Sequence, residues 1–359
     1  MKTGRTLEDL ARELTRQRAV KRDFISDTRN LHLDVVEDGK IQLSMTDDAS
    51  HVSHILGVNE VAHRQIGTAL KIPAPYYDRM RKEYPELLAT NVNGWFEKNP
   101  AAKMIRTLDG DARAFLSDRY RRIDNYEIAE AVLPIIAEMP EARVESCEVT
   151  DSRMYLKVVN PRLVADVVPG DTVQAGILIT NSEVGMGSVA VQPLLYRLVC
   201  TNGMVVNDAA SRRYHIGRAN AIGENFEIFT DETIKADDRA FMLKIRDTVR
   251  AAVDEAKFSR VVDMMRVAKG IPLETPDIPK FVELTATEHG MTQGEGKGVL
   301  NHLIHDGDLS LYGLSNAVTR FAQDVESYDR STEIESIGYS ILGMSMAVLN
   351  RLSRASAEV

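Results

Sequence analysis

Three stretches of apolar–polar alternation between residues 154 and 199 constrain the fold of this chain most strongly. Met154, Leu156 and Val158 alternate with polar or longer neighbours, residues 173–179 repeat the pattern, and residues 188–199 form a third such segment. A period of two is typical of strands, and short polar connections favour antiparallel neighbours. We therefore expect an α+β fold with an antiparallel meander sheet, packed helices and a C-terminal helical region.

The connections between these strands are expected to be loops. They are NPRLVADVVPGD at 160–171 and NSEVGMG at 181–187. In YRLVCTNGM, Asn202-Gly203 is expected to bend the chain after a core strand with positive φ, because Asn-Gly favours tight turns. This places Cys200 in the core as a small apolar residue. Arg197 then lies on the opposite face, within reach of a phosphate or an acidic partner.

Helix and hairpin patterns precede the sheet. Thr6 is expected to cap a helix in which Leu7, Leu10 and Leu14 share one face. Alternation on both sides of Asp38-Gly39 predicts a β-hairpin over 31–45. A helical pattern interrupted by prolines follows from 58 to 98, and Asn125 is expected to cap a helix after a strand that begins near Ala112.

The chain after residue 222 has helical periodicity. One long helix is expected over 242–256, then a linker at 270–280 and an apolar stripe over 314–348, in which Thr332 and Glu335 form a capping box. This apolar stripe has two interpretations: it packs on the chain's own sheet, or it forms a seam between subunits. We expect three regions: 1–100 with the helix, hairpin and helices, 101–222 with the sheet core, and 223–359 with the C-terminal helices.

Charge and cysteine content limit the classes of function. The formal net charge is −9, which disfavours a protein coated in basic residues for duplex DNA. Residues 223–238 hold six acidic residues against one lysine, whereas residues 1–30 carry eight basic residues against five acidic ones. Two cysteines, no export signal and no long apolar run predict a cytoplasmic protein with reduced thiols and no membrane association.

Candidate catalytic motifs do not meet the requirements of their chemistry. In HGMTQGEGKG, residue 291 is Met where a phosphate-binding loop has its first glycine, so we expect a mobile loop. His51 and His54 have metal-ligand spacing, but no second half of a zinc site follows, and the segment is expected to begin a helix. Cys200 with His215 is a weak nucleophile pair because Cys200 is expected in the core. We expect no catalytic residue, metal or cofactor.

Arginine and tyrosine alternate in three segments. SDRYRRIDNY, LLYRLV and SRRYHIGR together supply the candidate nucleic-acid-binding residues Arg119, Tyr120, Arg121, Arg122, Tyr196, Arg197, Arg212 and Arg213. Arginine neutralises phosphate and an aromatic ring stacks on an exposed base, a combination suited to single strands. Alternatively, the tyrosines pack internally and the arginines pair with Asp118 and Asp124.

Three stretches resemble a known family. ARAFLSDRYRRIDN, GILITNSEVGMGSVAVQPLLYRLVCTNGM and LSNAVTRFAQDVESYD are similar to the phage- and plasmid-associated family that carries the domain of unknown function 932. The resemblance spans roughly residues 45–345 and implies a role in DNA transactions of mobile elements, without established catalytic residues. The order of helix, three strands and long helix also resembles that of RecT/Redβ-type annealing proteins.

These observations lead to one functional hypothesis and two alternatives. We expect a non-catalytic homo-oligomer that binds single-stranded DNA and anneals strands in phage or plasmid recombination. One alternative is a metal-dependent hydrolase or nuclease that uses His51 and His54. The other is a protein-binding regulator or anti-defence protein.

Overall fold

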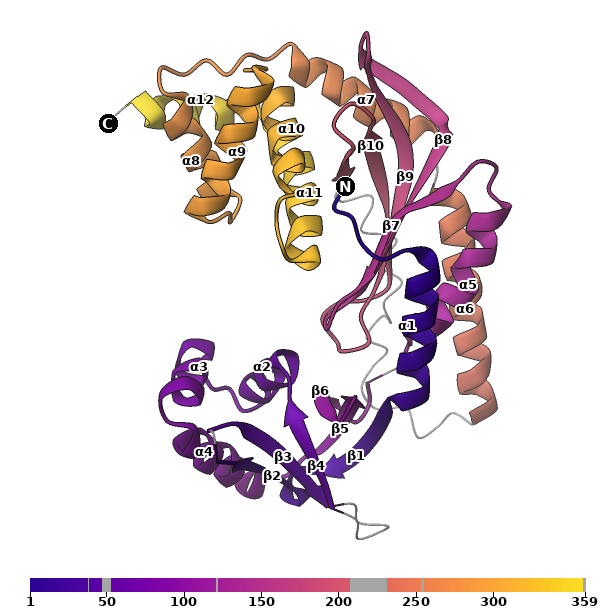
Figure 1. Ribbon diagram of the computed structural model, residues 1–359, viewed down its shortest axis with the longest axis vertical. Coiled ribbons are helices and arrows are strands. Elements are labelled where there is room, and N and C mark those ends of the chain that lie inside the picture. Colours follow the sequence, from indigo (N-terminus) through magenta and orange to yellow (C-terminus); the bar gives the residue numbers. More distant parts are fainter. Residues whose placement is uncertain (38, 47–52, 121, 207–230, 253–254, 358–359) are drawn as a thin grey trace.

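The computed structural model describes residues 1–359 except 38, 47–52, 121, 207–230, 253–254 and 358–359. Its strands are β1 Arg22–Asp27, β2 Leu31–Val35, β3 Ile41–Thr46, β4 Ser53–Val58, β5 Ala102–Leu108, β6 Asp111–Ser117, β7 Arg143–Val149, β8 Met154–Val168, β9 Asp171–Asn181, β10 Ala190–Arg197 and β11 Asn202–Val205. Its helices are α1 Leu7–Val20, the 3-10 helix η1 Thr28–Asn30, α2 Glu60–Ala69, α3 Ala74–Glu83, α4 Pro85–Lys98, α5 Asn125–Glu138, α6 Asp231–Ala252, α7 Glu255–Lys269, α8 Ile278–Glu288, α9 Gln293–Asp306, α10 Leu311–Phe321, α11 Tyr328–Leu342 and α12 Met346–Ala357. The molecule curves like a letter C, with β1–β6 and α2–α4 below and α8–α12 above (Figure 1).

The lower part is built on a six-stranded sheet with the order β1-β5-β6-β4-β3-β2. The predicted hairpin is present as β2 and β3, and the predicted helices are α2, α3 and α4. The 102–117 hairpin joins this sheet because β5 pairs with β1, and β6 pairs in parallel with β4. The sequence-based division at residue 100 therefore cuts through the lower sheet.

The second sheet is the predicted antiparallel meander, in the order β11-β10-β9-β8-β7. Its three central strands match the three alternating segments, so the α+β class is confirmed. The loop predicted at 160–171 is wrong, since β8 continues to Val168 and only Pro169-Gly170 turns the chain. Gly170 supplies the positive φ of 84° that this turn requires.

Both faces of the meander are covered. Ile177 and Ile179 of β9 pack in a buried cluster with residues of α1, α5 and α6. Leu178 and Tyr196 lie in a second cluster with Met1 and Tyr328. Every described residue of β9 except Thr172 is buried, so this central strand offers no open face to a ligand.

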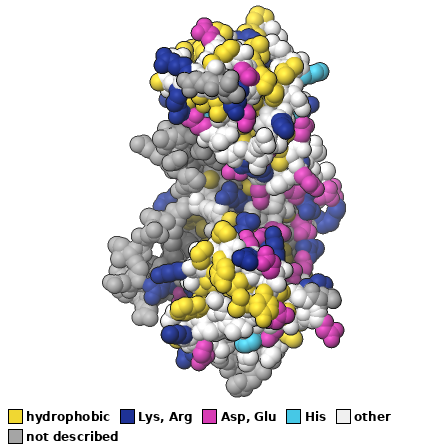
Figure 2. Space-filling view, turned by 90° about the vertical axis from the view of Figure 1, so that its left-hand side faces the viewer, with side chains coloured by type: hydrophobic (Ala, Val, Ile, Leu, Met, Phe, Trp, Pro, Cys, Tyr) yellow, Lys and Arg dark blue, Asp and Glu magenta, His cyan; other side chains and the backbone are white. Residues whose placement is uncertain are grey.

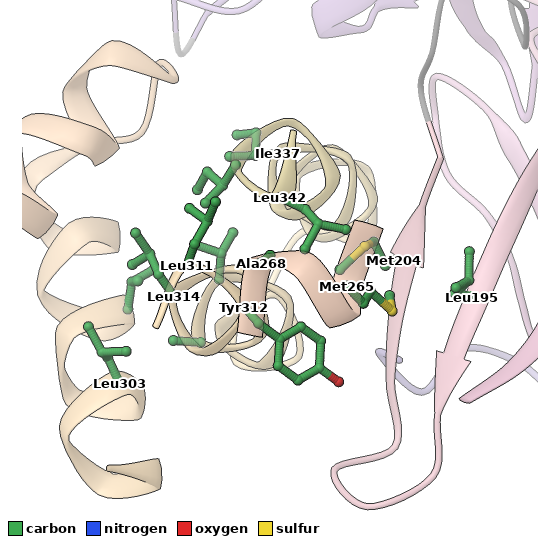
Figure 3. Packing of buried hydrophobic residues seen from close by; sticks show 14 of the residues in the cluster. Leu195, Met204, Met265, Ala268, Leu303, Leu311, Tyr312, Leu314, Ile337 and Leu342 are labelled. Atoms are coloured by element: carbon green, nitrogen blue, oxygen red, sulfur yellow. The ribbon is translucent and has the colours of Figure 1, made fainter. Parts of the chain in front are cut away.

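The C-terminal helices form the largest core cluster with α7 and the upper end of the meander (Figure 3). The apolar stripe expected over 314–348 is divided between α10, α11 and α12 and packs inside this chain, as the first of its two interpretations predicts. Thr332 and Glu335 do not form a capping box, because α11 begins at Tyr328 and is capped by Ser327. The loop predicted at 289–298 is also wrong, because Thr292 and Glu295 form a capping box that starts α9.

The helix starts predicted at Thr6 and Asn125 are confirmed, the second with a shift of one residue. Thr6 caps α1 by accepting a hydrogen bond from the Asp9 amide. The cap of α5 is Asp124 rather than Asn125, since Asp124 and Glu127 form the capping box. His54 lies in β4, not at a helix start. The helix predicted over 242–256 corresponds to α6 and the first residues of α7.

Candidate functional site

The structure places the candidate arginines and tyrosines in two separate regions. Arg119 and Arg122 are exposed and follow β6, while Tyr120 is half-buried between them and donates its hydroxyl to the Ser182 carbonyl at 3.2 Å. Tyr196 and Arg197 lie at the far end of β10. Arg121, Arg212 and Arg213 lie outside the described residues.

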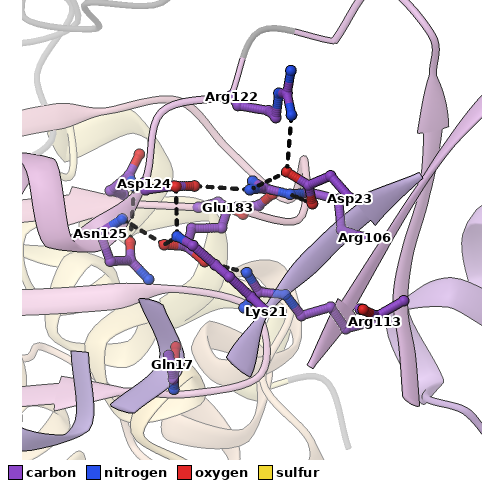
Figure 4. A network of polar contacts seen from close by, with 12 residues as sticks. Gln17, Lys21, Asp23, Arg106, Arg113, Arg122, Asp124, Asn125 and Glu183 are labelled. Atoms are coloured by element: carbon purple, nitrogen blue, oxygen red, sulfur yellow. Dashed lines mark hydrogen bonds and ion pairs between the residues drawn. The ribbon is translucent and has the colours of Figure 1, made fainter. Parts of the chain in front are cut away.

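The segment Ser117–Arg122, called the basic turn below, lies beside a buried network of charges, with Arg121 outside the described residues (Figure 4). Arg106 is completely buried at its centre and makes a two-point contact with Asp23, at 2.8 and 3.1 Å. Its guanidinium also donates to Asp124 and to the carbonyl of Glu183, at 2.8 and 2.9 Å. These four hydrogen bonds compensate the buried guanidinium for its lost hydration, because an unpaired buried charge is costly. We call the set Lys21, Asp23, Arg106, Arg113, Asp124 and Glu183 the junction network.

Glu183 brings the NSEVG loop into this network. Its carboxylate pairs with Arg113, lies 3.5 Å from the Lys21 ammonium and accepts the Asn125 amide at 2.6 Å. Neighbouring Asn181 donates from its side-chain amide to the Asn125 side-chain oxygen at 2.8 Å. The loop therefore holds the first turn of α5 against the lower sheet.

Gly185 allows this loop to lie close to β6. Its φ is 74°, and a Cβ at this position would lie 2.7 Å from Leu116. The position therefore requires glycine for its backbone conformation as well as for space.

The junction network leaves the basic turn positively charged. Burial would raise the pKa of Asp124, but Arg106 and Lys21 outweigh this effect and lower it, so the carboxyl stays ionised and bound to internal cations. Within the network and Arg122, which lies 3.4 Å from Asp23, four cationic side chains meet three carboxylates. The exposed Arg122 thus contacts a carboxylate, Asp23, that is already engaged by the buried Arg106.

Tyr196 and Arg197 are committed to internal contacts. Tyr196 is buried and donates its hydroxyl to Glu145 at 2.9 Å; burial, followed by Glu145, raises its pKa to about 12. Arg197 makes a two-point contact with Asp171 at 2.6 and 2.9 Å, and Asp171 also accepts the Tyr312 hydroxyl. Of the two partners expected for Arg197, a phosphate or an acidic group, the structure shows an acidic one, Asp171.

The two regions lie at opposite ends of the meander. Arg197 pairs with Val173, whereas the NSEVG loop follows Asn181 on the same strand. Eight residues of strand separate these positions, about 27 Å at the usual rise per residue. The eight candidate residues therefore do not form one continuous surface in the part of the chain that the structure describes.

The turn after Arg197 differs from the predicted Asn-Gly bend. Residues 198–201 make the turn, Thr201 has the positive φ of 51°, and Asn202-Gly203 begin β11. Cys200 is half-buried rather than in the core, and Arg197 donates to its sulfur at 3.2 Å. The apolar–polar alternation of the strand does not predict the position of Cys200, because the strand ends at Arg197.

The CTNGM stretch contacts the C-terminal helices. Asn202 donates to the hydroxyl of Thr319 in α10, and Gln323 donates to the Cys200 carbonyl at 3.1 Å. A Cβ at Gly203 would lie 2.5 Å from the Met1 side chain, so a larger residue here would require Met1 to move. Two of the stretches that resemble the family, YRLVCTNGM and LSNAVTRFAQD, therefore meet at this end of the sheet.

The two thiols should differ strongly in reactivity. Cys147 is buried, and this burial, followed by nearby Glu148, raises its pKa to about 11, whereas Cys200 is half-buried beside Arg197. Because the thiolate is the nucleophile, iodoacetamide at about pH 8 should modify Cys200 while Cys147 stays unmodified in the folded protein. Peptide mass spectrometry measures both sites. Equal modification in native protein would contradict this assignment.

The histidines examined as metal ligands have other roles where they are described. His54 packs against the Phe24 ring with centroids 4.9 Å apart. His63 is buried beside the Tyr77 hydroxyl at 3.0 Å, and burial lowers its pKa to about 4. Among the residues the structure describes, no three His, Cys, Asp or Glu side chains gather as metal ligands. His51 lies outside these residues, as does His215.

Sequence reasoning missed most of the junction network. Lys21, Asp23 and Arg106 come from the lower part of the molecule, and no local pattern marks them as partners of Glu183. Of its members, only Asp124 had been named from the sequence, as a possible partner of the nearby arginines. Accessible aromatic rings were also missed: Tyr76, Tyr84 and Trp95 are exposed on and between α3 and α4, in the lower part where hydrophobic side chains are visible at the surface (Figure 2).

The comparisons with known proteins agree with the resemblance. The model of the family described as a domain of unknown function (DUF932) matches residues 113–267, the central region of the chain. The match begins at Arg113 and includes the basic turn, the NSEVG loop and the CTNGM stretch. No curated protein and no solved structure matches the chain. No helix in the described ranges is long and apolar enough to cross a membrane.

Proposed function

We propose that this protein binds single-stranded DNA in the cytoplasm and serves strand annealing in the recombination of phages or plasmids. The observation that carries the proposal is the exposure of Arg119 and Arg122 on the basic turn, where the carboxylate that Arg122 contacts, Asp23, is also bound by the buried Arg106. Such a turn attracts phosphate even on a protein of net charge −9, because local charge governs short-range contacts in salt.

The contacts proposed are with phosphates rather than bases. Tyr196 is buried and Tyr120 is half-buried, so neither offers a full ring face for stacking. Phosphate contacts carry no direct sequence information and leave the base edges free. Free base edges are what annealing requires, because the complementary strand must pair with them. Arg121, Arg212 and Arg213 remain part of the proposed site on the basis of their sequence positions.

Binding should depend strongly on salt and only slightly on sequence. For a labelled strand of about 40 nucleotides, the log of the affinity should fall with the log of the salt concentration by about 0.7 per contacted phosphate. Arg119→Ala and Arg122→Ala should each weaken binding and reduce this slope by less than about one unit. Fluorescence anisotropy at several salt concentrations measures both quantities.

Arg12→Ala is the matched control, because Arg12 is exposed on α1, pairs only with Glu8 and Asp9 among the described residues, and carries the same charge. It should leave binding unchanged. No detectable binding at about 50 mM salt, where phosphate contacts are strongest, would reject the proposal and favour the protein-binding regulator.

The proposed activity also has an assembly component. We propose a homo-oligomer, because annealing proteins must hold many successive nucleotides of a strand. Light scattering with and without the same oligonucleotide gives the number of copies, and fluorescence transfer between two complementary labelled strands gives the annealing rate. The second candidate, a nuclease using His51 and His54, would instead shorten the strand when divalent metal is added.

A further inference from the structure

A pocket lies at the opposite end of the meander from the basic turn. It is open to solvent, has a volume of about 630 Å³, and forms where the 198–201 turn meets α9 and α10. Its lining residues are Val199, Cys200, Thr201, Asn301, His302, His305, Asp306 and Arg320. This volume lies within the usual range for small-molecule sites.

The pocket gathers groups that can donate hydrogen bonds. Arg320 is half-buried, and its guanidinium has no hydrogen-bond or ion-pair partner among the described residues. His302 is held by Asp324 through its Nε2 at 2.6 Å, and exposed His305 follows three residues later on the same side of α9. Arg197 donates to the Cys200 sulfur behind the turn.

The single carboxylate of the lining does not neutralise Arg320. Asp306 is exposed, and its oxygens do not come within ion-pair distance of the guanidinium in the described structure. A guanidinium without a protein partner leaves its N–H donors to water, and an anion can replace that water in a charge-assisted contact. The pocket is therefore arranged for a negatively charged ligand.

We propose that this pocket binds a small phosphate monoester of about nucleotide size. A phosphate monoester presents three terminal oxygens and carries nearly two negative charges at neutral pH. The guanidinium of Arg320 matches two of these oxygens in a forked contact. His305 and the amide of Asn301 are placed on the adjoining α9 to donate to the phosphate from another side. The remaining volume accommodates the organic part of the ligand.

The direct test is calorimetric titration of the full chain with adenosine 5′-monophosphate, inorganic phosphate and adenosine. The monophosphate and inorganic phosphate should bind, and adenosine should not. Arg320→Gln should weaken monophosphate binding at least about tenfold, the effect expected for losing a charge-assisted contact. Binding of adenosine equal to that of its monophosphate, or no binding of either phosphate compound, would overturn the proposal.

His305→Ala is the second variant, because His305 is exposed and its loss should leave the fold intact. It should weaken binding several-fold, whereas His32→Ala, which removes an exposed histidine on β2, should have no effect. Unchanged binding in both Arg320→Gln and His305→Ala would place the ligand elsewhere and reject the site.

Cys200 provides a reporter in the unmodified protein. A monophosphate in the pocket should slow alkylation of Cys200 at least several-fold, and the parent nucleoside should not. Arg119→Ala should retain this protection, since the basic turn lies at the other end of the sheet. The pocket and the proposed DNA-binding function can therefore fail independently. Alkylation that saturating monophosphate does not slow would contradict binding beside this turn.

Discussion

Replacing Glu183 by alanine is expected to lower the free energy of unfolding by about 3–5 kcal/mol, because it breaks a buried charge network from one side. Glu183 is buried. Its carboxylate pairs with Arg113 and Lys21 and accepts a hydrogen bond from the backbone amide of Asn125. The substitution leaves Arg113 buried without its carboxylate and leaves the first turn of α5 with an unpaired amide. Both losses cost more than the pair contributes when it is intact.

Urea denaturation followed by circular dichroism measures this effect. Glu86→Ala is the control, since Glu86 is an exposed acid near the start of α4 and should change stability by less than about 1 kcal/mol. Glu183→Gln should lie between the two, because an amide oxygen still accepts hydrogen bonds. A loss below about 1 kcal/mol for Glu183→Ala would show that the junction network does not hold the NSEVG loop to the lower sheet.

Replacing Lys157 by methionine is expected to destabilise the protein by about 3–5 kcal/mol, and the double variant Lys157→Met, Glu335→Leu should recover most of the loss. Lys157 and Glu335 are both completely buried and lie 2.6 Å apart, joining β8 to α11. The Lys157 ammonium also lies 4.8 Å from the centre of the Tyr328 ring. The single variant leaves a buried carboxylate without a counter-charge, whereas the double variant replaces the pair with apolar side chains.

The stabilities of the wild type, both single variants and the double variant form a thermodynamic cycle. Its coupling energy should be large, because the two side chains form one desolvated pair. Arg79→Met is a matched control for the loss of a charge, since Arg79 is exposed on α3 and pairs with Glu83 of the same helix. Additive losses in the double variant would mean that Lys157 and Glu335 act independently, and would contradict the interpretation of the pair as a clamp for the C-terminal helices.

Local sequence patterns predicted the elements that depend on neighbours in the chain. Thr6 and the apolar face that follows it produce α1, and Asp38-Gly39 separates the two strands of the predicted hairpin. The meander was predictable for the same reason, since each of its central strands pairs with the next one in sequence. Predictions failed where local signals compete: the 160–171 segment contains turn residues, yet pairing with β9 keeps it in β8.

The candidate site could be predicted only in part. The segment that contains Arg119 and Arg122 was identified from its composition, and both side chains are exposed. Tyr196 and Arg197 had the same composition, but Glu145 and Asp171 bind them internally. No local pattern identifies those carboxylates, because Glu145 lies 51 residues from Tyr196 and Asp171 lies 26 residues from Arg197.

The sequence by itself determined the α+β class, the meander and the positions of most helices, because hydrophobic periodicity and capping act over a few residues. Tertiary structure decided which charges are buried and which are exposed. Arg106 meets Glu183 across 77 residues, Lys157 meets Glu335 across 178, and Gln323 reaches Cys200 across 123. Both the basic turn and the pocket at Arg320 arise from such contacts, since desolvation and charge pairing depend on distance in space and not on distance along the chain.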